Sequence, residues 1–235
     1  MFSTLFTGYA LAHFAIAMSL VVLLIKRGYV PGAIFVAFTS FALTFDNGMI
    51  AWGAKIGPGD LLLSMSLPRF YMHAAFTPFL MFVAWMIAER AGLAFTRRRS
   101  LYFAMWLLVL GMSAWGIYAD LAGGLELQVA CLGDTLRYTT SAPPPQFCSP
   151  DQVSLPSHGP PIPSIAVVVV GTIIGALLWR AAGWPWLMLA SVFMFFASGA
   201  PKANLGPTIG NLGEIVLQAA FAATLWRFSR PRSNG

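Results

Sequence analysis

Long apolar runs separated by short polar breaks dominate the chain. A transmembrane helix needs about 20 apolar residues, because each adds about 1.5 Å along the axis and the hydrocarbon core is about 30 Å thick. Runs of this kind predict an all-α, polytopic membrane protein with seven helices at 4–25, 31–53, 69–88, 101–122, 163–180, 184–200 and 206–226. No length remains for a second domain, so residues 1–235 are predicted to form a single seven-helix transmembrane domain.

Composition supports the same class. The 235 residues are 58% hydrophobic and only 9% charged, and the mean hydropathy is +0.73, whereas soluble domains carry about 25% charged residues. We therefore expect the lipid bilayer to be the partner of this chain, in a bacterial cytoplasmic (inner) membrane. The formal net charge of +6 does not indicate nucleic-acid binding, because the basic residues gather at helix ends.

The basic residues predict the orientation. Ten of the 14 fall on one side of the seven-helix arrangement: Lys26, Arg27, Arg90, Arg97, Arg98, Arg99, Arg180, Arg227, Arg230 and Arg232. Only Lys55, Arg69, Arg137 and Lys202 fall on the other. The positive-inside rule makes the richer side cytoplasmic, which puts the N-terminus outside and the C-terminus inside. The first run has neither a basic start nor a cleavage site, so we expect it to stay as the first helix.

The largest predicted loop, residues 123–163, lies on the extracytoplasmic side. Its many prolines disfavour regular structure and favour extended or turn segments. It carries both cysteines of the chain, Cys131 and Cys148, and an oxidising exterior would allow them to form a disulfide. Two free thiols are the alternative. The loop could cap an outward-facing cavity or serve only as a tether.

Polar residues interrupt the second and third predicted helices. Asp46 and Asn47 lie in the outer half of the second helix, and Arg69 and His73 begin the third. An ionisable residue at the centre of a membrane costs about 2.5 to 3.5 kcal/mol on insertion scales, so such residues indicate a functional site. For Arg69 the alternative is a side chain that reaches out to lipid phosphates.

Two further helices contribute to the same layer. Asn211 and Glu214 lie in the glycine-rich start of the last helix, and His13 lies in the first. At about 1.5 Å per residue, the depths of His73, Asp46, Glu214 and His13 from the outer ends are roughly 6, 10, 12 and 14 Å. We therefore expect an outward-open polar pocket. A packed interior histidine at His13 and a protonated Glu214 among close-packed glycines are the alternatives.

The predicted pocket suits more than one chemistry. The leading hypothesis is an intramembrane enzyme for a lipid-like or isoprenoid substrate, with Asp46, His73 and Glu214 as catalytic groups and Asn47, Arg69 and Asn211 binding the substrate. A divalent metal activating water is a variant of it. A small-solute or proton-coupled transporter is the second possibility. In the third, His13 and His73 bind haem or a pigment in an accessory subunit of a membrane complex.

Two local patterns add to these hypotheses. Gly171 and Gly175 have the G-x-x-x-G spacing that lets another helix approach closely, so they are candidates for helix–helix association. Arg69 and Thr77-Pro78 resemble, in type and spacing, the third helix of microbial rhodopsins. The last predicted helix has no lysine to form a retinal Schiff base, so this resemblance does not extend to photochemistry, and we assign no family.

Overall fold

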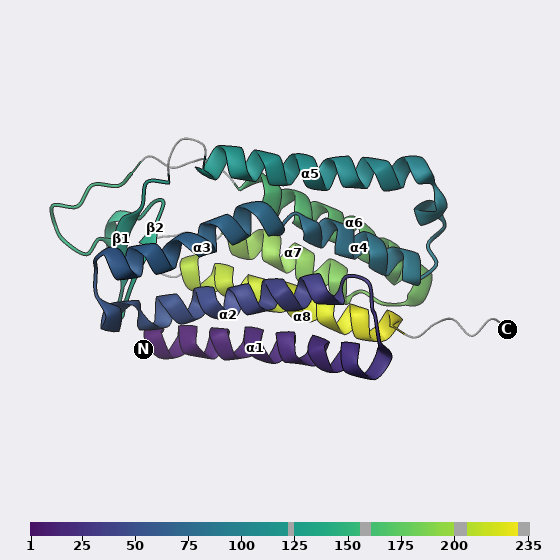
Figure 1. Cartoon of the computed structure of the whole chain (residues 1–235), viewed down its shortest axis with the longest axis horizontal. Helices are drawn as coiled ribbons and strands as arrows, with labels where there is room; N and C mark the ends of the chain where they lie inside the picture. The colour runs from purple at the N-terminus through teal and green to yellow at the C-terminus, as the bar shows by residue number, and fades with distance from the viewer. Residues whose placement is uncertain (122–124, 156–160, 200–205, 230–235) are drawn as a thin grey trace.

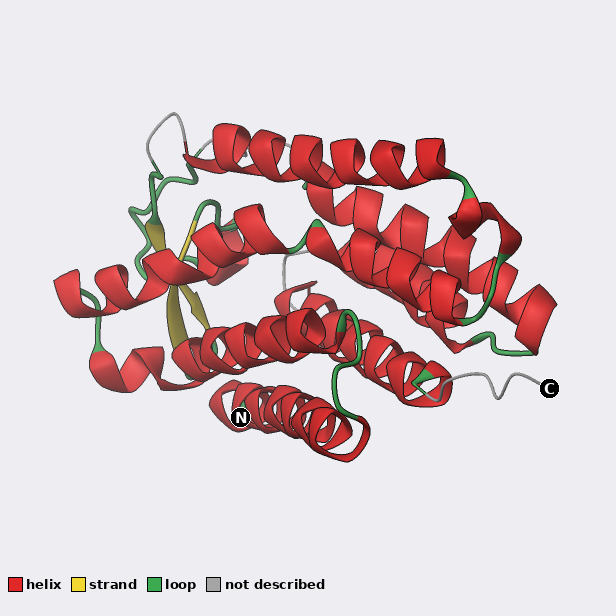
Figure 2. Cartoon of the chain, turned by 45° about the vertical axis from the view of Figure 1, so that its right-hand side comes forward, coloured by secondary structure: helices red, strands yellow, loops and turns green. Residues whose placement is uncertain are grey.

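A computed structural model describes residues 1–121, 125–155, 161–199 and 206–229 of the chain. Within these residues, eight α-helices lie roughly along one direction and form a bundle with a small β-hairpin at one end (Figure 1, Figure 2). The predicted all-α class is thus confirmed. The helices are α1 (Phe2–Arg27), α2 (Ala33–Ile56), α3 (Asp60–Phe76), α4 (Phe79–Arg90), α5 (Arg99–Leu121), α6 (Ile162–Ala182), α7 (Trp186–Ser198) and α8 (Gly206–Phe228).

Helix lengths bear directly on the predicted number of membrane crossings. Five helices of the described chain, α1, α2, α5, α6 and α8, are long and apolar enough to cross a membrane. A sixth span results if α3 and α4, which are bent by 46° at their break, cross together. The α7 helix has 13 residues, which give about 20 Å at 1.5 Å per residue, less than the roughly 30 Å of a hydrocarbon core. Helix length therefore supports five or six spans and leaves the seventh undecided.

The third predicted helix, 69–88, differs most from the structure. It is two helices, and the first of them, α3, already begins at Asp60 and continues through Pro68. The apolar residues 61–67, which lie between the predicted helices 31–53 and 69–88, are helical. A break occurs at Pro78, because α3 ends at Phe76 and α4 begins at Phe79. Proline lacks the N–H that would continue the helical hydrogen bonds, which accounts for a break at this position.

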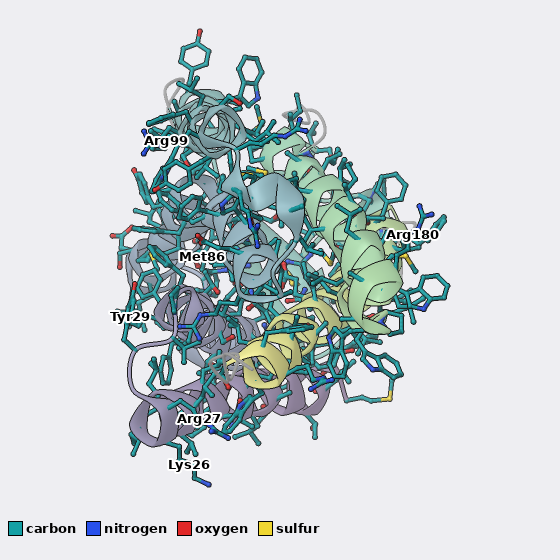
Figure 3. All side chains as sticks on the ribbon, turned by 90° about the vertical axis from the view of Figure 1, so that its right-hand side faces the viewer. Lys26, Arg27, Tyr29, Met86, Arg99 and Arg180 are labelled. Carbon is teal, nitrogen blue, oxygen red and sulfur yellow. A yellow bond between two sulfur atoms is a disulfide. The ribbon has the colours of Figure 1, made fainter. Side chains whose placement is uncertain are left out.

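The two ends of the bundle differ in charge. At the hairpin end lie the start of α1, the connection between α2 and α3, and the β-hairpin (Figure 1). The opposite end, here called the basic end, holds the α1–α2, α4–α5 and α6–α7 connections (Figure 1). Figure 3 looks onto the basic end and labels Lys26, Arg27, Arg99 and Arg180 there. Of the ten basic residues used to predict the orientation, these four therefore lie at one end of the bundle, and Arg230 and Arg232 lie outside the described residues.

The sequence does not predict the β-hairpin, because the many prolines of the loop disfavour regular structure. Strand β1 (Gln128–Leu132) pairs in antiparallel register with β2 (Thr135–Thr139) through a tight turn at Gly133 and Asp134. Gly133 has a positive φ of 57°, a conformation that glycine adopts without strain. Regular structure, which we expected the prolines to disfavour in this loop, forms in its first part, because the prolines begin only at Pro143, after both strands.

A disulfide fixes the segment that follows the hairpin. Cys131 on β1 is bonded to Cys148, as predicted. The Gln152 side chain strengthens this link, because its Nε2 donates to the carbonyl of Val129 at 2.6 Å and its Oε1 accepts from the Cys148 N–H at 2.8 Å. The proline-rich segment is thereby held against β1.

The hairpin is docked on the helices through close backbone contacts. Gly53 of α2 lies against the backbone carbonyl of Leu136, so closely that a β-carbon would overlap it. The Tyr138 hydroxyl accepts a hydrogen bond from the N–H of Gly59 at 3.1 Å. Strand β2 is therefore attached to both ends of the connection between α2 and α3.

The apolar core is centred on α4. Seven consecutive α4 residues, Leu80 to Met86, are buried or half-buried, and they pack with α8 residues such as Phe221 and Leu225 in the main hydrophobic cluster. The short helix α4 is therefore enclosed by its neighbours, and the bend at Pro78 brings it there. The residues of α5 are in contrast largely exposed on its outer face, as expected for a helix that contacts lipid.

The G-x-x-x-G pair of α6 is used inside this chain. A β-carbon at Gly171 would meet the Ser191 hydroxyl, and one at Gly175 would overlap the backbone at Met188 of α7. The close helix approach expected from the spacing therefore occurs between α6 and α7. Association with another chain through these glycines stays a prediction.

The contact at Gly53 generates a stability prediction. Gly53→Ala should lower the free energy of unfolding by about 1 to 3 kcal/mol, because the added methyl group forces Leu136 and α2 apart. Gly48→Ala in the same helix is the matched control, since a β-carbon there meets nothing within 4 Å. It should be neutral or stabilising by up to about 1 kcal/mol, because alanine favours helix more than glycine does. Unfolding in detergent measures both, and equal effects would contradict the docking.

Candidate functional site

A cavity of about 440 Å³ lies between α2, α3, α4, α6, α7 and α8. Most of its walls are apolar, with Phe, Leu, Val and Met side chains. Its polar lining residues come from helices at both ends of the sequence and comprise Thr39, Asp46, Arg69, His73, Thr77, Ser164, Glu214 and Gln218. All three predicted catalytic residues, Asp46, His73 and Glu214, are among them. This combination of apolar walls with a few polar groups is typical of small-molecule sites.

The centre of the polar wall is an ion pair between Asp46 and Arg69. The Arg69 Nε contacts the Asp46 Oδ1, and both side chains are nearly buried, with 12% and 10% exposure. Arg69 also donates from Nη1 to the Tyr138 carbonyl at 3.4 Å. Its guanidinium is therefore engaged within the protein and connects α2, α3 and β2.

His73 lies on the other side of the same carboxylate. Arg69 and His73 are four residues apart on α3 and so lie on one face of it, and His73 Nε2 is 3.8 Å from Asp46 Oδ2. That distance is longer than a normal hydrogen bond, and the His73 side chain is 41% exposed. Asp46 thus holds the two α3 side chains together, while the imidazole keeps an open side towards the cavity.

The opposite wall of the cavity belongs to α8. Glu214 lines the cavity, and its buried Oε2 has no hydrogen-bond partner among the described residues. One turn further, Gln218 Oε1 accepts from the hydroxyls of Thr39 and Ser40, each at 3.4 Å. These contacts connect α8 to α2, and Glu214 is left available for a group that enters the cavity.

The remaining predicted residues lie outside the cavity lining. Asn47 is fully buried, and its Nδ2 donates to the Leu43 carbonyl at 2.9 Å. Asn211 Nδ2 donates to the Pro207 carbonyl at 2.7 Å. Both amides are therefore bonded to their own helices. The substrate-binding role predicted for them stays a prediction.

His13 is completely buried in α1, and neither of its ring nitrogens has a hydrogen-bond partner among the described residues. It does not line the cavity, whereas His73 does. A cofactor held between the two histidines stays a prediction, and the cavity is lined by only one of them, His73. Among the described residues no three His, Cys, Asp or Glu side chains lie close enough to hold a metal ion, so the divalent metal expected as a variant has no ligand set there.

Two parts of the site were missed from the sequence. Tyr138 binds Arg69 only because β2 folds back onto α3, and nothing in the local sequence predicts that contact. Three phenylalanines of the cavity lining, Phe38, Phe41 and Phe45, follow a helical repeat on α2 just before Asp46. That spacing is a signal that could have marked an apolar wall next to the charged residues.

Comparisons of this chain with family models, curated proteins and solved structures found no match. The fold and the site define the class: an α-helical protein with several helices long and apolar enough for a membrane, and with a buried ion pair in the wall of an internal cavity. Its function has to be inferred from that cavity.

The buried ion pair generates a prediction of thermodynamic coupling. Asp46→Leu and Arg69→Met should each lower the free energy of unfolding by about 3 to 5 kcal/mol, because each leaves one buried charge without its partner. The double variant should lose much less than the sum, since it contains neither charge. Unfolding of the four proteins in one detergent forms the double-mutant cycle, and additive losses would show that the two charges do not depend on each other.

Proposed function

We propose that the chain is an integral membrane protein of a bacterial cytoplasmic membrane, with seven crossings, an external N-terminus and a cytoplasmic C-terminus. In support, the described helices run back and forth between the two ends of the bundle (Figure 1). The basic residues gather at one end (Figure 3), which the positive-inside rule makes cytoplasmic. In this proposal α3 and α4 cross as one bent span and α7 crosses as a short one.

The orientation can be measured with one added cysteine at a time, because the two native cysteines are bonded to each other. Asp151→Cys lies in the exposed segment at the hairpin end, and Ser100→Cys lies at the exposed start of α5. A membrane-impermeant maleimide added to intact spheroplasts should label the first variant at once and the second only after permeabilisation. The reverse pattern would invert the proposed topology.

We further propose that the protein is an intramembrane enzyme that acts on a lipid-like or isoprenoid substrate by proton transfer. The observation that carries this proposal is the set of three ionisable groups, Asp46, His73 and Glu214, that line one apolar cavity from α2, α3 and α8. A group that transfers a proton and a group that holds the substrate need to face the reacting atoms from different directions. This arrangement provides two such directions.

Each group then has a defined task. His73 accepts a proton at Nδ1 from a substrate hydroxyl or a water molecule and later returns it to the leaving group. Asp46 lies 3.8 Å from Nε2, so it orients the ring and stabilises the positive charge that the imidazole gains. Arg69 balances the charge of Asp46 when His73 is neutral. Glu214 on the opposite wall accepts a hydrogen bond from the polar end of the substrate, and the apolar walls keep bulk water away.

The enzyme proposal predicts large and shared losses. With membrane lipids in vesicles and turnover followed by mass spectrometry, His73→Gln should reduce turnover by about 10² to 10⁴, the usual contribution of a general acid or base. Glu214→Gln should reduce it by at least about tenfold, because a charged hydrogen-bond acceptor for the substrate is lost. Glu126→Gln is the matched control, since Glu126 is exposed outside the cavity, and it should keep full activity. Equal folded yield is checked by thermal unfolding. Full activity in His73→Gln would contradict the mechanism.

One observation favours transport as a second candidate. The helix break at Thr77-Pro78 lies beside the cavity, and Thr77 lines it. Broken helices with exposed backbone groups form the substrate sites of many secondary transporters. Flux of a solute or of protons across sealed vesicles, lost in Glu214→Gln and without any chemical change in the lipid, would favour transport over catalysis.

A further inference from the structure

The cavity reaches the side of the bundle. Four of its lining residues are exposed: Phe38, Phe41 and Phe45 of α2, and Pro68 of α3. The other lining residues, on α4, α6, α7 and α8 included, are buried or half-buried. The opening therefore lies between α2 and α3, and its most exposed residues, these four, are apolar.

The hairpin covers the neighbouring end. Strand β2 contacts the last part of α2 at Gly53 and the start of α3 near Gly59. In addition, the Tyr138 carbonyl accepts from Arg69, which is itself in the cavity wall. A molecule approaching from the hairpin end meets this strand, whereas the side opening between α2 and α3 faces the hydrocarbon region in the proposed membrane arrangement.

The polar wall has no free Lys or Arg side chain among the described residues. Arg69 is the only Lys or Arg that lines the cavity in the described chain, and it is already paired with Asp46 and bonded to Tyr138. Glu214, by contrast, has a buried carboxyl oxygen without a partner among the described residues. A buried acceptor without a donor is unfavourable, so the group that completes this wall should donate a hydrogen bond.

We propose that the cavity binds a long-chain membrane amphiphile whose head group carries a hydroxyl or an amine and no negative charge. The head donates to Glu214, and the chain leaves the cavity between α2 and α3 past Phe38, Phe41 and Phe45. An anionic head would meet the Glu214 carboxyl group and no free Lys or Arg side chain, which disfavours its binding. This inference rests on the proposed function for the membrane setting and names the substrate class of the same site.

Photolabelling in lipid nanodiscs tests the head group and the route together. Hexadecanol, hexadecylamine and hexadecyl phosphate, each with a diazirine part-way along the chain, are offered to the purified protein. The alcohol and the amine should label the peptide that contains Phe38 to Phe45, and the unlabelled compounds should compete. Hexadecyl phosphate should bind at least about tenfold more weakly, the effect of losing one hydrogen bond to a charged group. Equal or tighter binding of the phosphate would overturn the proposal.

Two variants locate the interaction. Glu214→Gln should weaken the amine by at least about tenfold and the alcohol less, because the amide keeps an acceptor oxygen but carries no charge; Glu126→Gln should change neither. Ala42→Trp, on the cavity wall beside the opening, should reduce labelling by both compounds, whereas Ala104→Trp on the exposed face of α5 should not. Unchanged labelling in Ala42→Trp would place the ligand elsewhere.

The outcomes separate this inference from the proposed function. Selective binding of the alcohol and amine without any turnover would leave the ligand class standing and contradict the enzyme. Turnover that needs His73 but prefers a phosphate-bearing lipid would leave the enzyme standing and overturn the ligand class.

Discussion

The buried ion pair between Asp46 and Arg69 is the constraint around which the rest of the site is arranged. Two charges can leave water together only if each finds the other and their remaining polar atoms find partners. The structure meets this condition by placing α3 beside α2 and by bringing the Tyr138 carbonyl to Arg69. His73, four residues after Arg69, is thereby fixed on the other side of the same carboxylate.

The hairpin is the second part of that arrangement. Its attachment needs a residue without a side chain at Gly53, because the Leu136 carbonyl occupies the space of a β-carbon. It also needs the segment after β2 to stay in place, which the Cys131–Cys148 disulfide provides. A loop at the end of the bundle is thus connected through Tyr138 to a charged group in the cavity wall, so the stability of the loop and the geometry of the site depend on each other.

The cavity joins two environments that differ in polarity. Its inner wall carries Asp46, His73 and Glu214, and the four exposed residues at its opening between α2 and α3 are apolar. A molecule with one polar end and a long apolar chain fits both parts at once, which a small soluble molecule does not. The bend between α3 and α4 contributes to this shape, because it directs α4 into the core while α3 stays at the side of the opening.

The sequence by itself determined the class of the fold and most of the ionisable part of the site. Ionisable residues are costly among apolar ones, so Asp46, Arg69, His73 and Glu214 could be selected from their surroundings alone, and the two cysteines could be paired because both lie in the single large loop. Tertiary structure decided which of the selected residues meet. Asn47, Asn211 and His13 lie at similar depths, yet a helix turns by about 100° per residue, and only packing decides which face looks into the cavity. The early start of α3, the hairpin and the contact of Tyr138 with Arg69 depend in the same way on neighbours distant in sequence, and no local pattern encodes them.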